Sequence, residues 1–195
     1  MAGTRLFVHK DIFEQVITGI KVMAESFKIG HGLDPDKDFG PLISDTQRKR
    51  VMSYIQAGID EGAELITGGK IAGEKGFFIQ PTIFTQVHGD MKIAKEEIFG
   101  PVLCAQSFGD NDLETIAQQA NDTSYGLSGS VWTQDISVAH KMAMLIDAGQ
   151  VSINWHAAVD PAIPFGGNKQ SGWGREFGKE GLEPYLKTKA TSVIF

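Results

Sequence analysis

Residues 95–102 constrain the fold of this chain more than any other segment, because they place charge, an aromatic ring and a backbone break side by side. Two adjacent glutamates precede Phe99, and a Gly-Pro pair then leads into the apolar run 102–108. Glycine tolerates unusual φ angles, and proline fixes its own φ and disfavours helix in the residue before it. The pattern predicts a rigid turn that places Glu97 and Phe99 at the start of a buried strand.

Two interpretations of this turn follow from its chemistry. A carboxylate accepts two hydroxyl hydrogen bonds at once, and an aromatic ring can cover a flat heterocycle. Glu97 and Phe99 are therefore candidates for holding a ribose and its attached base, since rigid loops beside a sheet are where ligand-binding groups collect. The alternative is an ordinary surface turn with solvated glutamates, which is the usual state of charged side chains.

Hydrophobic periodicity predicts that strands and helices alternate along the chain. Predicted helices cover 11–27, 44–61, 111–121 and a stretch that Asp135 caps and Gly149 stops. Predicted strands cover 5–9, 64–66, 102–108, 129–133 and 151–155. Residues 77–84 are expected to be extended and interrupted by Pro81, hence near a sheet edge or a bend. Such alternation is typical of βαβ units, so we expect an α/β fold with a mostly parallel sheet flanked by helices.

Shorter signals refine this outline. Ser44 with Gln47 matches a capping box at the start of the second helix. Residues 157–174 are rich in glycine and proline without a sustained period, which predicts a long functional loop. Residues 186–195 read as a terminal strand whose free edge is available to pair with another subunit.

Composition excludes several classes of function. The net charge of -6 argues against nonspecific binding to nucleic acid or to an anionic membrane. A single cysteine excludes an internal disulfide and a cysteine-based zinc cage, and the five histidines show no paired ligand spacing, so we expect no metal site. No apolar run approaches the ~20 residues that span a bilayer, and the first residues lack a signal-peptide apolar region, so we expect a cytoplasmic location.

The segment 95–102 resembles the EEIFGP motif of the NAD(P)-dependent aldehyde dehydrogenase superfamily. Further landmarks of that family occur in family order, namely 2–5 (Ala-Gly-Thr-Arg), 40–43, 80–82, 121–127 and 164–172. The resemblance covers essentially the whole chain, and the loop 160–176 is similar to phenylacetaldehyde dehydrogenase-like members. It implies oxidation of an aldehyde to a carboxylic acid, a catalytic-domain portion over 1–185 and an oligomerisation strand over 186–195.

The resemblance also assigns roles to individual residues. Glu97 would hold the hydroxyls of the nicotinamide ribose, and Phe99 would pack near the nicotinamide. The substrate side would be lined by Phe165 with Trp155, His156 and Val159. An apolar pocket of this kind suits a bulky or aromatic aldehyde, although Val159 stands where the family has an aromatic pocket residue. Trp155 is alternatively a core anchor and His156 a polar loop residue.

The family's catalytic thiol cannot be assigned to any residue of this sequence. In the family the nucleophilic cysteine lies just upstream of the segment that here is 2–5. The general-base glutamate, the oxyanion-hole asparagine and the dinucleotide-binding domain lie further upstream. Cys104 sits in an apolar strand, where a free cysteine is commonly a small buried hydrophobe. We therefore expect a C-terminal fragment that is inactive alone, with NAD or NADP bound only in the full-length parent.

Two other functions remain open on the sequence. One is a non-catalytic dimerisation or assembly module derived from the same family. The other is an independent enzyme that uses Cys104. Without a cofactor domain, apolar surface and strand edges would be uncovered, so we expect a homodimer or a higher homo-oligomer.

Overall fold

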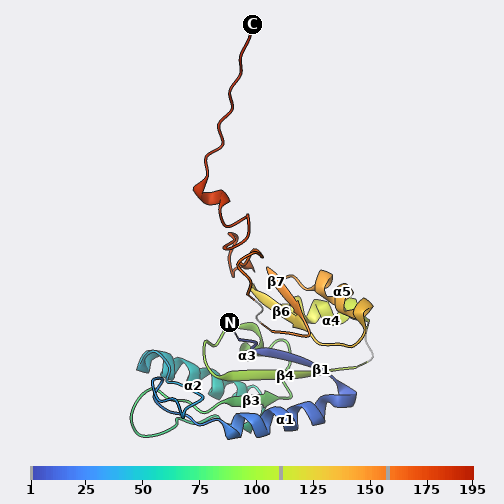
Figure 1. Cartoon of the computed structure of the whole chain (residues 1–195). Coiled ribbons are helices and arrows are strands. Elements are labelled where there is room, and N and C mark those ends of the chain that lie inside the picture. Colours follow the sequence, from blue (N-terminus) through green and yellow to red (C-terminus); the bar gives the residue numbers. More distant parts are fainter. Residues whose placement is uncertain (1, 110–111, 157–158) are drawn as a thin grey trace. The chain divides into compact units, whose positions relative to one another are not determined.

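The computed structural model describes residues 2–109, 112–156 and 159–195, which fall into two compact units, 2–122 and 123–195 (Figure 1). Each unit has its own sheet and its own helices, and the two are described separately below. Of the sequence predictions, those for Asn111 and for the first two residues of the loop 157–174 lie outside the described residues.

Within the described residues, the unit 2–122 is built on a four-stranded sheet in the order β1-β4-β3-β2. The strands are β1 (Arg5–His9), β2 (Glu64–Thr67), β3 (Thr82–Thr85) and β4 (Val102–Phe108). β1 and β3 run parallel to β4, whereas β2 is antiparallel to β3. The predicted α/β class is confirmed, and the sheet is mixed. β3 begins directly after Pro81.

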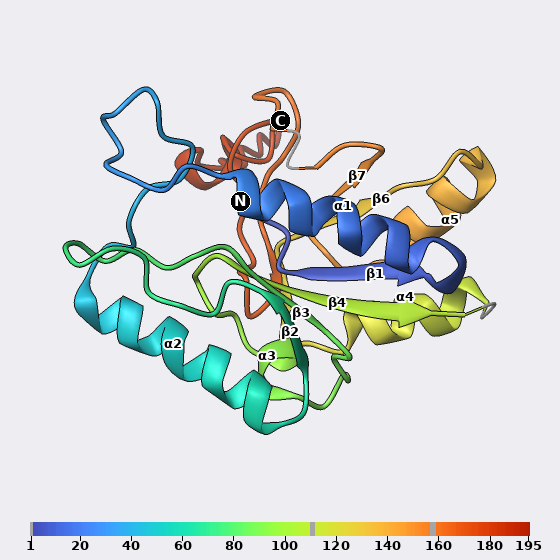
Figure 2. The same ribbon diagram turned by 90° about the horizontal axis from the view of Figure 1, so that it is seen from below.

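Helices cover both faces of this sheet. They are α1 (Phe13–Ser26), α2 (Asp45–Asp60), the short α3 (Lys92–Lys95) and α4 (Leu113–Asn121), and a 3-10 turn, Lys10–Ile12, precedes α1. Figure 2 shows α1 on one side of the sheet and α2 with α3 on the other. The main core fills the α2 side, and its buried members include Val51, Tyr54, Ile55, Phe84, Ile93, Ile98 and Cys104.

The unit 123–195 contains a βαβ element. β6 (Ser128–Val131) and β7 (Gln150–Ile153) are parallel, and α5 (Ile136–Leu145) connects them. Asp135 caps α5 as predicted, since its Oδ1 accepts hydrogen bonds from the backbone N–H groups of Ser137 at 2.8 Å and Val138 at 3.1 Å. A second ladder pairs β5 (Tyr125–Gly126) with β8 (Asn168–Lys169) in antiparallel orientation.

The predicted role of Gly149 is wrong. α5 ends at Leu145, and Ile146 is its C-cap. A Cβ atom on Gly149 would lie 1.8 Å from the carbonyl oxygen of Gly166. Glycine is needed there because another backbone segment passes close by, and a helix pattern in the sequence does not encode that passage.

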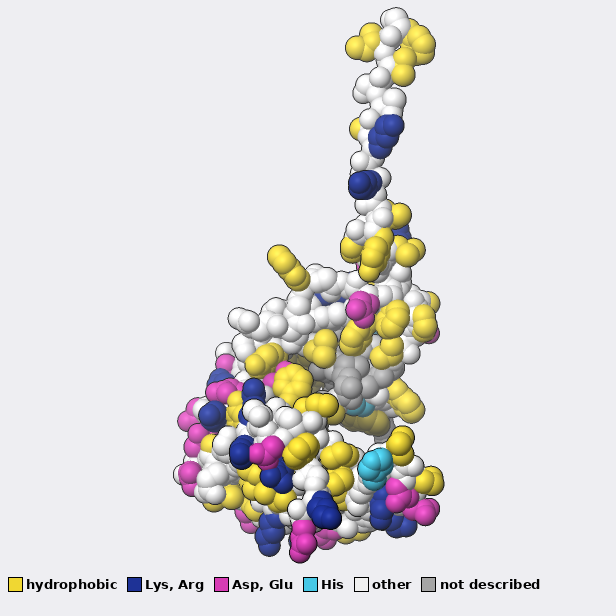
Figure 3. Space-filling model, turned by 90° about the vertical axis from the view of Figure 1, so that its left-hand side faces the viewer, with side chains coloured by type: hydrophobic (Ala, Val, Ile, Leu, Met, Phe, Trp, Pro, Cys, Tyr) yellow, Lys and Arg dark blue, Asp and Glu magenta, His cyan; other side chains and the backbone are white. Residues whose placement is uncertain are grey.

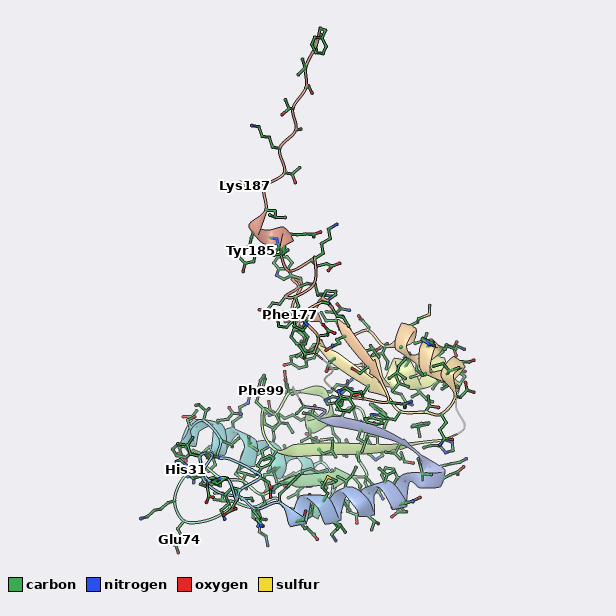
Figure 4. All side chains as sticks on the ribbon, in the orientation of Figure 1. His31, Glu74, Phe99, Phe177, Tyr185 and Lys187 are labelled. Atoms are coloured by element: carbon green, nitrogen blue, oxygen red, sulfur yellow. The ribbon has the colours of Figure 1, made fainter. Side chains whose placement is uncertain are left out.

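The predicted strand over 186–195 is not present as a strand. The described chain has a 3-10 turn, Glu183–Tyr185, and after it the residues are exposed without a backbone ladder. Figure 4 shows Tyr185 and Lys187 on this tail, and Figure 3 shows apolar side chains gathered at its end. Pairing of this segment with another subunit stays a prediction, since an extended segment becomes a strand only when a neighbour supplies backbone partners.

No helix in the described parts of the chain is both long enough and apolar enough to cross a membrane.

Candidate functional site

The turn between α3 and β4 is held in place by side chains of helix α2. Gln47 Nε2 donates hydrogen bonds to the carbonyl oxygens of Ile98 at 3.1 Å and Phe99 at 2.9 Å. Arg50 Nη2 donates to the carbonyl oxygen of Glu97 at 3.1 Å. Three consecutive carbonyl groups of the turn are therefore fixed by one helix, which satisfies backbone acceptors that would otherwise depend on water.

Close packing fixes the rest of the turn. Ile98 is buried in the core beneath α2. A Cβ atom on Gly100 would lie 2.5 Å from Cγ2 of the buried Val51, so a larger residue does not fit. The carbonyl oxygen of Pro101 accepts a hydrogen bond from the backbone N–H of Thr82 at 2.8 Å, which joins the turn to the sheet. The prediction of a rigid turn at the start of a buried strand is confirmed.

Phe99 adopts a backbone conformation that aromatic residues rarely take. Its φ is 55°, in the left-handed region, and its side chain is 66% exposed. Figure 4 shows the labelled side chain projecting from the turn. Left-handed backbone at a bulky residue is strained and persists only where the surroundings impose it. Here the hydrogen bond from Gln47 and the burial of Ile98 impose it.

The carboxylate of Glu97 is available to a ligand. The residue is half-buried, and within the described residues its side chain has no hydrogen-bond or ion-pair partner. Its neighbour Glu96 differs, since Glu96 Oε2 accepts a hydrogen bond of 2.6 Å from the hydroxyl of Tyr54. One glutamate of the pair is thus tied to α2, and the other keeps both oxygens free to accept.

The four residues expected on the substrate side belong to the unit 123–195. β7 ends at Ile153, and Asn154 follows with a φ of 52° that turns the chain. Trp155 and His156 come next in the sequence. Trp155 is 62% exposed and Val159 is also exposed, so neither is a core anchor within this unit.

Two local contacts orient this loop. His156 Nδ1 lies 2.5 Å from Ser130 Oγ on β6, and its Nε2 is buried without a partner among the described residues. Phe165 is half-buried and exchanges two backbone hydrogen bonds of 2.7 Å with Glu176. The structure thus holds Phe165 and His156 by contacts within their own unit, and Glu97 with Phe99 by contacts within the other.

Cys104 is buried, as predicted, and is 1% exposed. Desolvation raises the pKa of its thiol from 9.0 to about 12. Its Sγ donates to the carbonyl oxygen of Ile93 at 3.4 Å in the core. The thiolate, which is the nucleophilic form, is therefore not populated at neutral pH.

Sequence reasoning missed the contribution of α2. Gln47 was assigned to a capping box, and its backbone N–H does bind Ser44 Oγ at 3.2 Å, but its side chain reaches the turn instead of the cap. Arg50 and Tyr54 of α2 also contact the turn. Their spacing in the sequence could have indicated this, because residues 50 and 54 are one helical turn apart and lie next to the apolar Val51. They are therefore expected near the side of the helix that meets the core.

Comparisons with known proteins place the chain in one family. The family model described as "Aldehyde dehydrogenase family" matches residues 1–191. The chain is 44% identical over 192 residues to "Aldehyde dehydrogenase" of Enchytraeus buchholzi, which covers 98% of this chain and 38% of that protein. It is 41% identical over 196 residues to "Phenylacetaldehyde dehydrogenase" of Pseudomonas fluorescens, covering 100% of this chain and 39% of that protein.

A solved structure is also similar. It is the NAD+ complex of an aldehyde dehydrogenase from Bacillus cereus, with 45% sequence identity and a TM-score of 0.92 over 95% of this chain and 38% of that chain. The present chain therefore spans about two fifths of the length of the relatives it matches.

Proposed function

Because this chain belongs to the aldehyde dehydrogenase family, we propose that it forms the C-terminal part of the catalytic region of an enzyme that oxidises an aldehyde to a carboxylic acid with NAD or NADP. The family landmarks along the sequence support this placement, since the segment 2–5 follows the nucleophile in that family. In this proposal residues 1–185 belong to the catalytic domain, and the dinucleotide-binding domain and the nucleophile come from the remainder of a longer polypeptide.

The observation that carries the proposal is the turn containing Glu97 and Phe99. It presents a free carboxylate beside a projecting ring, and contacts from a separate helix hold it in a strained conformation. Strain that the surroundings impose is expected where a ligand must be met in a fixed geometry. Glu97 would accept hydrogen bonds from the two hydroxyls of the nicotinamide ribose, and Phe99 would pack near the nicotinamide.

When bound, the dinucleotide supplies the acceptor for the hydride that leaves the aldehyde carbon. The residues of this chain would bind and orient it and would shape the substrate side. There Phe165, Trp155, His156 and Val159 provide mostly apolar surface, which suits a bulky or aromatic aldehyde. The similarity to the phenylacetaldehyde dehydrogenase of Pseudomonas fluorescens supports this substrate class.

We further propose that the 195-residue chain alone does not oxidise aldehydes. Its one cysteine is buried, and burial keeps the thiol protonated. Neither of the forms that a covalent mechanism needs, an exposed thiol or a thiolate, is therefore offered by this residue. A cytoplasmic location stays a prediction.

A chimera tests the proposed function. Residues 1–195 replace the matching segment of the Bacillus cereus enzyme, and NADH formation from phenylacetaldehyde is followed by absorbance. We expect activity from the chimera and none from the chain alone. Glu97→Gln in the chimera should raise the KM for NAD+ by about tenfold or more, the scale of hydrogen bonds to a charged group. The control is Glu74→Gln, which removes a charge from an exposed loop.

Two results would contradict the proposal. Turnover by the isolated chain that disappears in Cys104→Ser would mean that this chain is an enzyme in itself. An NAD+ KM that Glu97→Gln leaves unchanged would remove the assigned ribose contact.

A second candidate function is a non-catalytic assembly module, and the tail favours it. Val193, Ile194 and Phe195 are exposed apolar residues at the end of a segment without a backbone partner. Pairing of 186–195 with another subunit would cover them, and a homodimer or a higher homo-oligomer would result. Sedimentation velocity of the chain with and without residues 186–195 tests this, and a monomer in both cases would contradict it.

A further inference from the structure

Tyr54 contacts the side chains of Arg50, Glu96 and Lys92 beside the turn, although the proposed function gives it no part. It lies on α2 and is 5% exposed. Its hydroxyl donates to Glu96 Oε2 at 2.6 Å and accepts from Arg50 Nη2 at 3.3 Å. A core residue chosen for packing alone would be phenylalanine, because a buried hydroxyl needs partners to offset its desolvation.

Two cationic side chains lie near the ring of Tyr54. The guanidinium carbon of Arg50 lies 5.4 Å from the ring centroid, and Nζ of Lys92 lies 5.0 Å from it. Cations near an aromatic ring are attracted by its quadrupole. The ring is thus held in one orientation, and its hydroxyl is aimed at Glu96.

The same Arg50 nitrogen connects Tyr54 to the ligand-binding glutamate. Arg50 Nη2 contacts both the hydroxyl of Tyr54 and the carbonyl oxygen of Glu97. The turn is consequently held on both sides of the 96–97 peptide, by the side chain of Glu96 and by the backbone of Glu97. A peptide that is fixed at both ends leaves the Glu97 side chain few directions in which to point.

We propose that Tyr54 is a positioning residue, whose hydroxyl holds Glu96 and Arg50 so that the Glu97 carboxylate is presented to the ribose of the dinucleotide. The inference rests on the proposed function for its ligand, and on the contacts of Tyr54 for its mechanism. Its physical basis is preorganisation, since a carboxylate already aimed at two hydroxyl groups loses less conformational entropy when they bind.

Hydrogen bonding to Glu96 raises the pKa of the Tyr54 hydroxyl, with burial adding in the same direction. The hydroxyl therefore remains protonated, and able to donate to Glu96, throughout the neutral range.

The first test needs no cofactor. Backbone 15N relaxation and amide hydrogen exchange of the 195-residue chain report the mobility of Glu97 and Phe99. We expect Tyr54→Phe to mobilise both residues while the amides of β3 keep their protection. Gln56→Ala is the matched control, since Gln56 lies on the same helix and contacts the exposed Asp60. Unchanged mobility in Tyr54→Phe would overturn the inference.

The second test uses the chimera. Tyr54→Phe should raise the KM for NAD+ about five- to tenfold with kcat nearly unchanged, because one hydrogen bond orients the binding group without touching the reacting atoms. Glu96→Ala should raise the KM for NAD+ by a similar factor, and the double variant Tyr54→Phe with Glu96→Ala should raise it little further. Glu96→Gln should retain much of the affinity for NAD+, because an amide oxygen still accepts a hydrogen bond from the Tyr54 hydroxyl.

The outcomes separate the two proposals. If the turn becomes mobile but the NAD+ KM does not move, while Glu97→Gln does raise it, the positioning role is wrong and the proposed function stands. If Glu97→Gln leaves the KM unchanged, the ribose contact assigned to Glu97 in the proposed function is wrong, and the nucleotide part of this inference is wrong with it. A loss in kcat equal to the rise in KM would indicate general damage and would also overturn the positioning role.

Discussion

The two sets of candidate site residues are held in different ways. Glu97 and Phe99 lie on the turn between α3 and β4. Helix α2 holds this turn by hydrogen bonds from Gln47, Arg50 and Tyr54. In the other unit, Trp155 and Val159 are exposed, whereas His156 and Phe165 are held by contacts with Ser130 and Glu176 of their own unit. The difference indicates that the turn carrying Glu97 and Phe99 is preorganised within this chain.

Truncating one large aromatic in each unit should reveal this difference most strongly. Phe84 is fully buried under α2, whereas Trp155 is 62% exposed. Phe84→Ala should lower the free energy of unfolding by about 3–5 kcal/mol, because it leaves a cavity in the core. Trp155→Ala should change it by less than about 1 kcal/mol, since little burial is lost. Urea denaturation followed by circular dichroism measures both, and similar losses would contradict the comparison.

The glycine in the turn offers the next largest effect. Gly100→Ala places a Cβ atom against the buried Val51, and such overpacking costs about 1–3 kcal/mol. Gly174→Ala is the matched change in the other unit, where the added Cβ meets nothing within 4 Å, and stability should be nearly unchanged. Thermal melts of the two variants measure both changes in stability. A Gly100→Ala protein as stable as the parent would show that the turn can shift to make room for the added Cβ atom beside Val51.

Gln47 tests whether α2 acts on the turn through hydrogen bonds. Gln47→Ala removes two donors to the turn but leaves the Ser44 cap, which uses the backbone N–H of residue 47. We expect a loss of about 1 kcal/mol, the usual net value of a hydrogen bond in folding. Chymotrypsin should also cleave faster after Phe99, which is exposed. Unaltered cleavage would mean that the other contacts of the turn fix it without Gln47.

Cys104 gives the smallest effect at neutral pH and a definite one in alkali. Burial raises the pKa of the folded thiol to about 12, above the 9.0 of an unperturbed thiol. The unfolded chain thus releases this proton first, so stability is unaffected below about pH 9 and decreases between about 9 and 12. Urea midpoints across this range should decrease more in the parent chain than in Cys104→Ala. Equal slopes would indicate that Cys104 does not remain protonated in the fold.

Much of the fold could be predicted because the signals are local. Ser44 and Asp135 mark helix starts through hydrogen bonds that span two or three residues, and both caps are present. The run 102–108 is apolar and forms β4 over the same bounds. The expected terminal strand depended on a partner that the described chain does not supply, and a sequence pattern cannot report whether such a partner is bound.

The sequence by itself determined the α/β order of elements, the turn before β4 and the burial of Cys104, because each depends on residues close together in the chain. Tertiary structure alone decided that Gln47 would hold Ile98, 51 residues away, and that Tyr54 would hold Glu96. It also decided that position 149 must be glycine, because the backbone of Gly166 passes close to it. The physical reason is that such contacts follow from how packed elements approach one another, and no short-range preference encodes that approach.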